Sequence, residues 1–339
     1  MTTRTRSFVI LSLVILGVGL GTGLVAYYHG FPVGAARREG PEELQFVPRD
    51  AVVIAFANVQ EVMASDVRKK LHGALPINEN GQQELQNATG INLETDIDRV
   101  VACLVPEGGQ PGMHGSGMVI ARGHFDEGRI EALMREHGAD VQDYNGSRLI
   151  VAHAPNAEQT SVSLAFLEHG LAAIGTTNLI KNAVDLHRTG DHPTVQSATE
   201  NEELMTLVKT LDWGNNAWAV GRFDALTAQA HLPENVSSKL PAITWFSLGA
   251  HIDGGIRGTV RAEARDEEAA NNLRDVVRGF LALAKMQAGS RPDINTMMQS
   301  LDLGGTGKTV ALSFTVPAEV FDAIGGEIHK RVPAQPDLR

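Results

Sequence analysis

An unbroken apolar run near the N-terminus is the clearest hydrophobic pattern in the chain. Residues 8–28 contain no charged side chain, and Arg4 and Arg6 precede them. A helix of this length spans about 30 Å, which matches the hydrocarbon core of a bilayer. The pattern predicts a cytoplasmic N-terminus (1–7) and a transmembrane helix (8–28), with the remaining body outside the cytoplasm. This describes a single-pass membrane protein.

A cleaved signal peptide is the alternative interpretation of this segment. Gly34 and Ala36 could form a small-residue cleavage site. The apolar run is longer than the roughly 7–15 residues of a signal-peptide core, which favours an uncleaved anchor. Arg37 and Arg38 follow the run. The positive-inside rule therefore gives only a weak indication of orientation.

Glycines recur on this predicted helix at a spacing of four residues. Gly17 pairs with Gly21, and Gly19 pairs with Gly23. Such small-residue spacing lets two helices approach closely in lipid and indicates a possible homodimer. Glycine is also simply common in membrane helices.

The segments at the two ends of the body are rich in glycine and proline. Residues 29–43 contain three glycines and two prolines, which is typical of a linker. Residues 332–339 contain Pro333 and Pro336. We expect them to form a disordered tail.

Between these segments, strand and helix patterns recur in one order, twice. The first copy combines a continuous apolar strand (51–57), a helix capped by Asn58, a strand pair (97–105 and 118–124), a helix capped by Asp126 and a strand (149–152). The second combines a strand (217–222), a helix beginning at Asp224, a strand pair (243–252 and 256–264), a helix capped by Asp266 and a strand (310–316).

This repetition predicts two α+β modules, at 44–176 and 177–331. Each is a strand–helix–strand–strand–helix–strand unit, and together they form a largely antiparallel sheet with helices on one face. A hairpin over 162–176 and helices near 178–186 and 199–211 lie between the two copies. Asn145-Gly146 also predicts a tight hairpin turn.

Two stretches of the body carry a resemblance. Val47-Pro48-Arg49-Asp50-Ala51 and the closing residues 308–317 (KTVALSFTVP) resemble a group of uncharacterised bacterial proteins. Those have an N-terminal anchor or signal and a repeated α+β extracytoplasmic body. The resemblance implies a location in the bacterial periplasm or at the cell surface, and it assigns no functional residue.

Charge and cysteine content exclude several classes of protein. The net charge of −11 argues against nucleic acid as a partner, because phosphate binding requires a cationic surface. The single cysteine, Cys103, excludes a disulfide framework and a cysteine-rich zinc site.

Residues 304–309 (GGTGKT) look like a phosphate-binding loop. The full pattern requires glycine at position 302, where Asp302 stands, and the loop must open a helix. Here it precedes a strand pattern, so a glycine turn in a hairpin is the better interpretation.

The densest group of metal-capable side chains comprises Asp185, His187, Asp191 and His192. Imidazole and carboxylate suit zinc. The group follows a helix and lies beside Gly190 and Pro193, where polar residues gather in any case, so a solvated loop is favoured.

Two potential nucleophiles also lack the surroundings that they need. Cys103 lies in an apolar strand without a local positive charge, which indicates a buried structural thiol. Ser116 follows His114 in a glycine-rich loop, but a nucleophile elbow needs glycines at positions 114 and 118, where His114 and Met118 stand.

We therefore assign no catalytic residue, cofactor or metal site. The leading hypothesis is a membrane-anchored, non-catalytic body that binds or scaffolds a protein partner of the envelope. Two alternatives stay open. One is a hydrolase whose residues meet only in space, and the other is a carrier of an apolar ligand held between sheet and helices.

Overall fold

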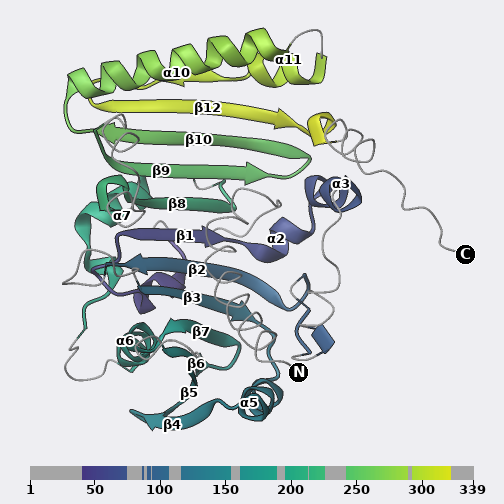
Figure 1. Ribbon diagram of the computed structural model, residues 1–339, viewed down its shortest axis with the longest axis vertical. Helices are drawn as coiled ribbons and strands as arrows, with labels where there is room; N and C mark the ends of the chain where they lie inside the picture. The colour runs from purple at the N-terminus through teal and green to yellow at the C-terminus, as the bar shows by residue number, and fades with distance from the viewer. Residues whose placement is uncertain are drawn as a thin grey trace, which may run out of the picture.

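The computed structural model describes residues 40–74, 86–87, 90–92, 94–106, 116–153, 161–188, 195–212, 214–225, 242–288 and 292–321. Its centre is one antiparallel sheet of twelve strands (Figure 1). In the chain these strands are β1 (Val53–Ala57), β2 (Ile97–Val105), β3 (Ser116–Gly123), β4 (Asp140–Tyr144), β5 (Ser147–His153), β6 (Ser161–Glu168), β7 (Leu171–Thr176), β8 (Ala217–Arg222), β9 (Ile243–Ile252), β10 (Gly255–Ala264), β11 (Asp302–Gly304) and β12 (Thr309–Pro317).

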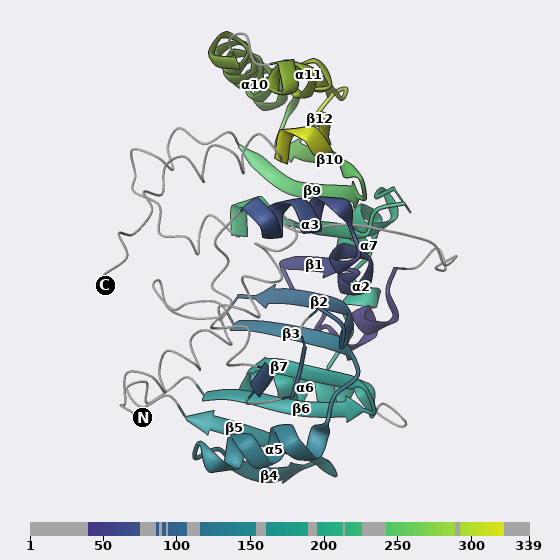
Figure 2. The same cartoon turned by 90° about the vertical axis from the view of Figure 1, so that its right-hand side faces the viewer.

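The helical elements are the 3₁₀ turns η2 (Glu42–Phe46) and η3 (Ala198–Glu200) and the helices α2 (Val59–Met63), α3 (Asp66–Ala74), α5 (Glu127–Glu136), α6 (Thr177–His187), α7 (Glu202–Lys209), α10 (Glu267–Ala288) and α11 (Pro292–Gln299). Along the sheet the strands follow the order β11-β12-β10-β9-β8-β1-β2-β3-β7-β6-β5-β4. Figure 2 shows this sheet turned by 90°, with α10 and α11 beyond β12 at one end and α5 beside β4 and β5 at the other.

Strand β1 lies in the middle of the sheet and is buried on both sides. It pairs with β2 on one side and with β8 on the other, so that Ile54 lies between Cys103 and Val220. Ile54 belongs to one core cluster, whereas Ala57 belongs to a second cluster on the opposite face. This explains why residues 51–57 are apolar throughout rather than alternating.

Helices cover both faces of the sheet, so the prediction that they lie on one face is wrong. Leu44 of η2, Ile180 of α6 and Leu204 of α7 pack in the first cluster. Val59 of α2 and Val67 of α3 pack in the second. The physical reason lies in the central strands, which bury apolar side chains in both directions and therefore need a cover on each face.

The two predicted modules are joined in one continuous sheet. Strands from both contribute to the first core cluster, for example Leu149 from β5 and Val220 from β8. The equivalence proposed between 149–152 and 310–316 is wrong, because β12 pairs directly with β10, whereas β7 and β6 separate β5 from β3. Two consecutive hairpins, β4–β5 and β6–β7, intervene before the chain returns to β3.

The fold as described contains no transmembrane helix, and that prediction is corrected. No helix within the described ranges is both long enough and apolar enough to cross a membrane. The 22 residues of α10 have the necessary length, but charged side chains interrupt them. The predicted span 8–28, with Gly17, Gly19, Gly21 and Gly23, lies outside the described residues, as does the predicted tail 332–339.

The folded body begins before residue 44, where the predicted linker ends. η2 starts at Glu42, and the side chain of Glu43 is fully buried. The remainder of the linker, residues 29–39, is outside the described part of the chain. The burial of Glu43 has a structural reason, because this carboxylate pairs with two arginines of the sheet.

Local predictions from the sequence are confirmed at helix starts and tight turns. Asn58 and Asp126 accept hydrogen bonds from backbone N–H groups in the first turns of α2 and α5. Asn145 and Gly146 both have positive φ angles, of 49° and 69°, in the β4–β5 turn, which is the geometry of a tight hairpin. Residues 305–308 likewise connect the antiparallel strands β11 and β12.

Candidate functional site

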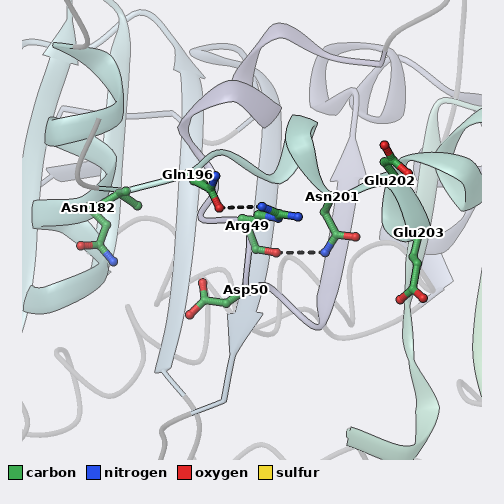
Figure 3. A pocket seen from close by; sticks show the side chains of 8 residues that line it. Arg49, Asp50, Asn182, Gln196, Asn201, Glu202 and Glu203 are labelled. Atoms are coloured by element: carbon green, nitrogen blue, oxygen red, sulfur yellow. Dashed lines mark hydrogen bonds between the residues drawn. The ribbon is translucent and has the colours of Figure 1, made fainter. Parts of the chain in front are cut away.

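A polar groove opens on the face covered by α6 and α7. Its volume is about 920 Å³. Figure 3 shows the residues that line it, which lie before β1, on α6, before α7 and at the start of α7. The lining residues are Arg49, Asp50, Asn182, Val195, Gln196, Asn201, Glu202 and Glu203.

Backbone hydrogen bonds fix the floor of this groove. Pro48 forms an antiparallel bridge with Ser197. The N–H of Arg49 donates to the carbonyl of Gln196 at 2.8 Å, and the N–H of Ala198 donates to the carbonyl of Val47 at 2.7 Å. Two segments about 150 residues apart thus run side by side like a short ladder, which holds both rims in place.

Two side-chain hydrogen bonds also join these two segments. The guanidinium of Arg49 donates to the amide oxygen of Gln196 at 2.6 Å, and the amide nitrogen of Asn201 donates to the carbonyl of Arg49 at 3.0 Å (Figure 3). The Asn201 oxygen meanwhile accepts from the N–H of Leu204 at 3.1 Å and caps α7. Asn201 therefore orients α7 relative to the groove floor.

A capping box holds the short turn η3 just before α7. The Ser197 hydroxyl accepts from the N–H of Thr199 at 3.2 Å, and the Glu200 carboxylate accepts from the N–H of Ser197 at 3.1 Å. The same hydroxyl donates to the carbonyl of Leu44 in η2. These contacts position the wall that bears Glu202 and Glu203.

An ion-pair network centred on the buried carboxylate of Glu43 lies beneath η2 on the same face of the sheet. Arg99 and Arg122 are direct cross-strand partners in β2 and β3. Both donate through Nε to the Oε1 of Glu43, at 2.8 and 2.7 Å. Burial alone would raise the pKa of Glu43, but the hydrogen bonds from Arg122 and Arg99 outweigh it and leave that pKa lowered.

This network anchors the segment that leads into the groove. Arg122 also donates to Glu168 at 3.0 Å. Two arginines that face each other across a strand pair would repel, and the carboxylate of Glu43 between them removes this repulsion. η2 is thereby tied to the sheet a few residues before Arg49.

The described lining of the groove is dominated by amides and carboxylates. Among its eight lining residues there is no histidine, cysteine, serine, threonine or lysine, and Val195 is the one aliphatic side chain. Asp50, Glu202 and Glu203 oppose a single cation, Arg49, which already bonds Gln196. Carboxylates accept hydrogen bonds, and amides both donate and accept them.

Of the four metal-capable residues for which the sequence favoured a solvated loop, the structure describes Asp185 and His187. Asp185 accepts hydrogen bonds from the Tyr144 hydroxyl at 2.9 Å and from the Asn145 amide at 2.6 Å. The ring of His187 lies 5.4 Å from that of Phe46. Asp191 and His192 lie outside the described residues. Within the part of the chain that the structure describes, no three histidine, cysteine or acidic residues are grouped to hold a metal ion.

Cys103, Ser116 and residues 305–308, for which the sequence analysis favoured no functional role, are not among the residues that line the groove. Cys103 is buried, and burial raises the pKa of its thiol to about 12, which confirms a structural thiol. Ser116 is buried in β3, and His114 falls outside the described part of the chain. Residues 305–308 lead into the strand β12 rather than into a helix, so they cannot present helix N–H groups to a phosphate.

Sequence reasoning did not find the groove. Its residues come from three separate segments, around positions 49, 182 and 195–203, and none forms a motif by itself. The one local signal was Ser197-Ala198-Thr199-Glu200, which has the capping-box pattern. This pattern predicts a helical turn, but it does not show which residues lie opposite that turn in the fold.

Comparison of the chain with protein-family models, with curated proteins and with solved structures finds no match. The resemblance to uncharacterised bacterial proteins therefore stays a prediction.

Proposed function

We propose that this protein is a non-catalytic binding body that recognises a polar, donor-rich segment of a partner protein in the groove between α6 and α7. One observation carries the proposal. The described lining consists mainly of amides and carboxylates on a frame held by hydrogen bonds, its one cation, Arg49, already bonds Gln196, and Val195 is its one aliphatic residue.

The residues that line the groove also distinguish this function from the two alternatives, a hydrolase and a carrier of an apolar ligand. A hydrolase that uses a serine, threonine or cysteine nucleophile with a histidine base finds none of these groups in the described lining, which leaves only its carboxylates for acid–base chemistry. A carrier of an apolar ligand needs a predominantly apolar cavity, but seven of the eight lining residues are polar or charged. A lining of amides and carboxylates suits the recognition of a partner through hydrogen bonds better than it suits a hydrolase or an apolar carrier.

The charge of the groove indicates what the partner presents. Three carboxylates and one engaged guanidinium leave an excess of hydrogen-bond acceptors. Lysine and arginine side chains carry donors without acceptors. A partner segment that contains them complements both the charge and the hydrogen-bonding pattern.

Peptide selection with paired variants tests the proposal. A displayed library of random 12-residue peptides is selected on the full-length protein, and the enriched peptides are titrated against variants at 150 mM salt. Glu202→Gln/Glu203→Gln removes two groove carboxylates, whereas Glu136→Gln/Glu319→Gln removes two exposed carboxylates on α5 and after β12. The two variants have the same net charge.

We expect enriched peptides to be rich in lysine and arginine and to bind the groove variant at least tenfold more weakly than the matched control. Both variants should unfold at temperatures close to that of the wild type. Equal loss of binding in both variants would mean that the net charge of −11, rather than the groove, attracts the peptides, and the proposal would fail. Selection of apolar peptides that ignore both changes would also overturn it.

A further inference from the structure

Helix α10 carries an apolar stripe that the described part of the body leaves exposed. Its inner face, with Ala270 and Leu273, packs against the sheet through Val310 of β12. Four other apolar side chains on the helix point outward, with exposed fractions of 49% for Val276, 69% for Phe280, 55% for Leu283 and 80% for Met286. Soluble proteins rarely expose a contiguous apolar patch without a binding purpose.

The spacing of this outer stripe is that of a helix-pairing surface. Its members follow one another at intervals of four, three and three residues, so they align along one side of α10. Figure 1 and Figure 2 both place α10 at one end of the body, beyond β12, where another molecule can approach it. Phe280 near the middle of the stripe is the kind of large aromatic anchor that dominates interfaces.

The charges along α10 favour a second copy of the same helix. Its first eleven residues hold three carboxylates and one guanidinium, and its last eleven hold the two cations Arg278 and Lys285. The halves thus carry net charges of −2 and +2 in a chain whose net charge is −11. An antiparallel copy places each half against the half of opposite sign, whereas a parallel copy places like charges together.

A lipid surface fits this helix less well. Interfacial helices that bind anionic lipid have a polar face rich in lysine and arginine. The polar face of α10 begins with Glu267 and Glu268 and is neutral in total. Twofold pairing, by contrast, is the commonest symmetry of protein oligomers and uses one self-complementary surface.

We propose that α10 is a dimerisation surface, on which the outer stripe of one copy packs antiparallel against the same stripe of a second copy about a twofold axis near Phe280. This is independent of the groove, which uses residues of the opposite face of the sheet. A contact limited to one helix pair falls at the small end of specific interfaces, below about 1,200 Å². We therefore expect a dissociation constant of roughly 1–100 µM.

Sedimentation velocity of the full-length protein from 1 to 200 µM tests the dimer. We expect monomer and dimer in concentration-dependent exchange, and at least a tenfold weaker association in Phe280→Ser/Leu283→Ser. Both side chains are exposed, so this variant should keep the wild-type unfolding temperature. Val260→Ser, which changes an exposed apolar residue of β10 instead, is the matched control and should associate like the wild type.

Charge reversal tests the antiparallel orientation. Arg278→Glu/Lys285→Glu makes both halves negative and should abolish the dimer. Adding Glu267→Lys/Glu268→Lys to that variant restores halves of opposite sign and should restore association. Three results would each overturn the proposal. The wild type could stay monomeric at every concentration, the dimer could survive Phe280→Ser/Leu283→Ser, or the variant with all four charge reversals could stay monomeric.

Discussion

The Nε of Arg122 donates a hydrogen bond of 2.7 Å to the Oε1 of Glu43, whose side chain is fully buried. The contact joins η2 to β3 across 79 positions of sequence. It also brings a negative charge between two arginines on neighbouring strands. The start of the body is thereby fastened to the sheet on the face that holds the groove.

Glu43→Gln should destabilise the fold by about 3 kcal/mol, because removing one partner of a buried ion pair leaves the opposed arginines uncompensated. Chemical denaturation measures the change in the free energy of unfolding. Glu168→Gln is the matched control. Its carboxylate also bonds Arg122 but is 45% exposed, so its loss should cost less than about 1 kcal/mol. Equal losses would show that the burial of Glu43 has no special effect.

The stabilisation from Glu43 should depend on pH in a definite direction. Its pKa in the folded protein is below the ordinary value of 4.5, so the unfolded chain takes up a proton first as the pH falls. The contribution is fully present above about pH 4.5 and is lost as the pH falls through the folded-state pKa. The difference in stability between wild type and Glu43→Gln should therefore be constant near neutrality and shrink below pH 4.5. A difference that grew on acidification would contradict this.

Cys103 should resist thiol reagents as long as the protein is folded. Burial raises its pKa to about 12, from an ordinary value of 9.0. The thiolate fraction at pH 8 is therefore about 1,000-fold lower than that of a free cysteine. Labelling with a chromogenic disulfide reagent should be slow in buffer and fast in urea. Rapid labelling of the folded protein would show that β2 opens readily.

A side chain at Gly146, the second position of the β4–β5 turn, should destabilise the fold. Gly146 has a φ of 69°, which disfavours a Cβ atom, so Gly146→Ala should cost about 1 kcal/mol. Gly304→Ala serves as the control, because a Cβ there meets no atom within 4 Å and its φ lies outside the left-handed range. Thermal unfolding should separate the two variants, and equal melting temperatures would exclude strain at Gly146.

Asn201 should stabilise the groove more than its neighbour Asn182. Asn201→Ala removes the cap of α7 and the hydrogen bond to Arg49, with an expected loss of about 1 kcal/mol. Asn182→Ala changes another groove amide, on α6, and should change the free energy of unfolding by less than about 0.5 kcal/mol. Denaturation midpoints of the two variants measure the difference. A larger loss for Asn182→Ala would show that α6 holds the groove more strongly than α7.

The sequence by itself determined the order of most strands and helices and several of their ends. Asn58, Asp126 and Asp266 cap helices, and Asn145-Gly146 turns a hairpin. These features depend on hydrogen bonds and backbone angles that involve only a few consecutive residues. Hydrophobic periodicity over such short windows is enough to show them.

Only the tertiary structure decided which face of the sheet each helix covers, the order of the strands in the sheet, and which residues line the groove. Residues 51–57 are apolar on both sides, so their pattern could not say that α2 and α7 lie on opposite faces. Arg49 meets Gln196, and Arg122 meets Glu43, across 147 and 79 positions. Such pairs depend on how twelve strands align, because each side chain finds its partner only after the sheet has formed.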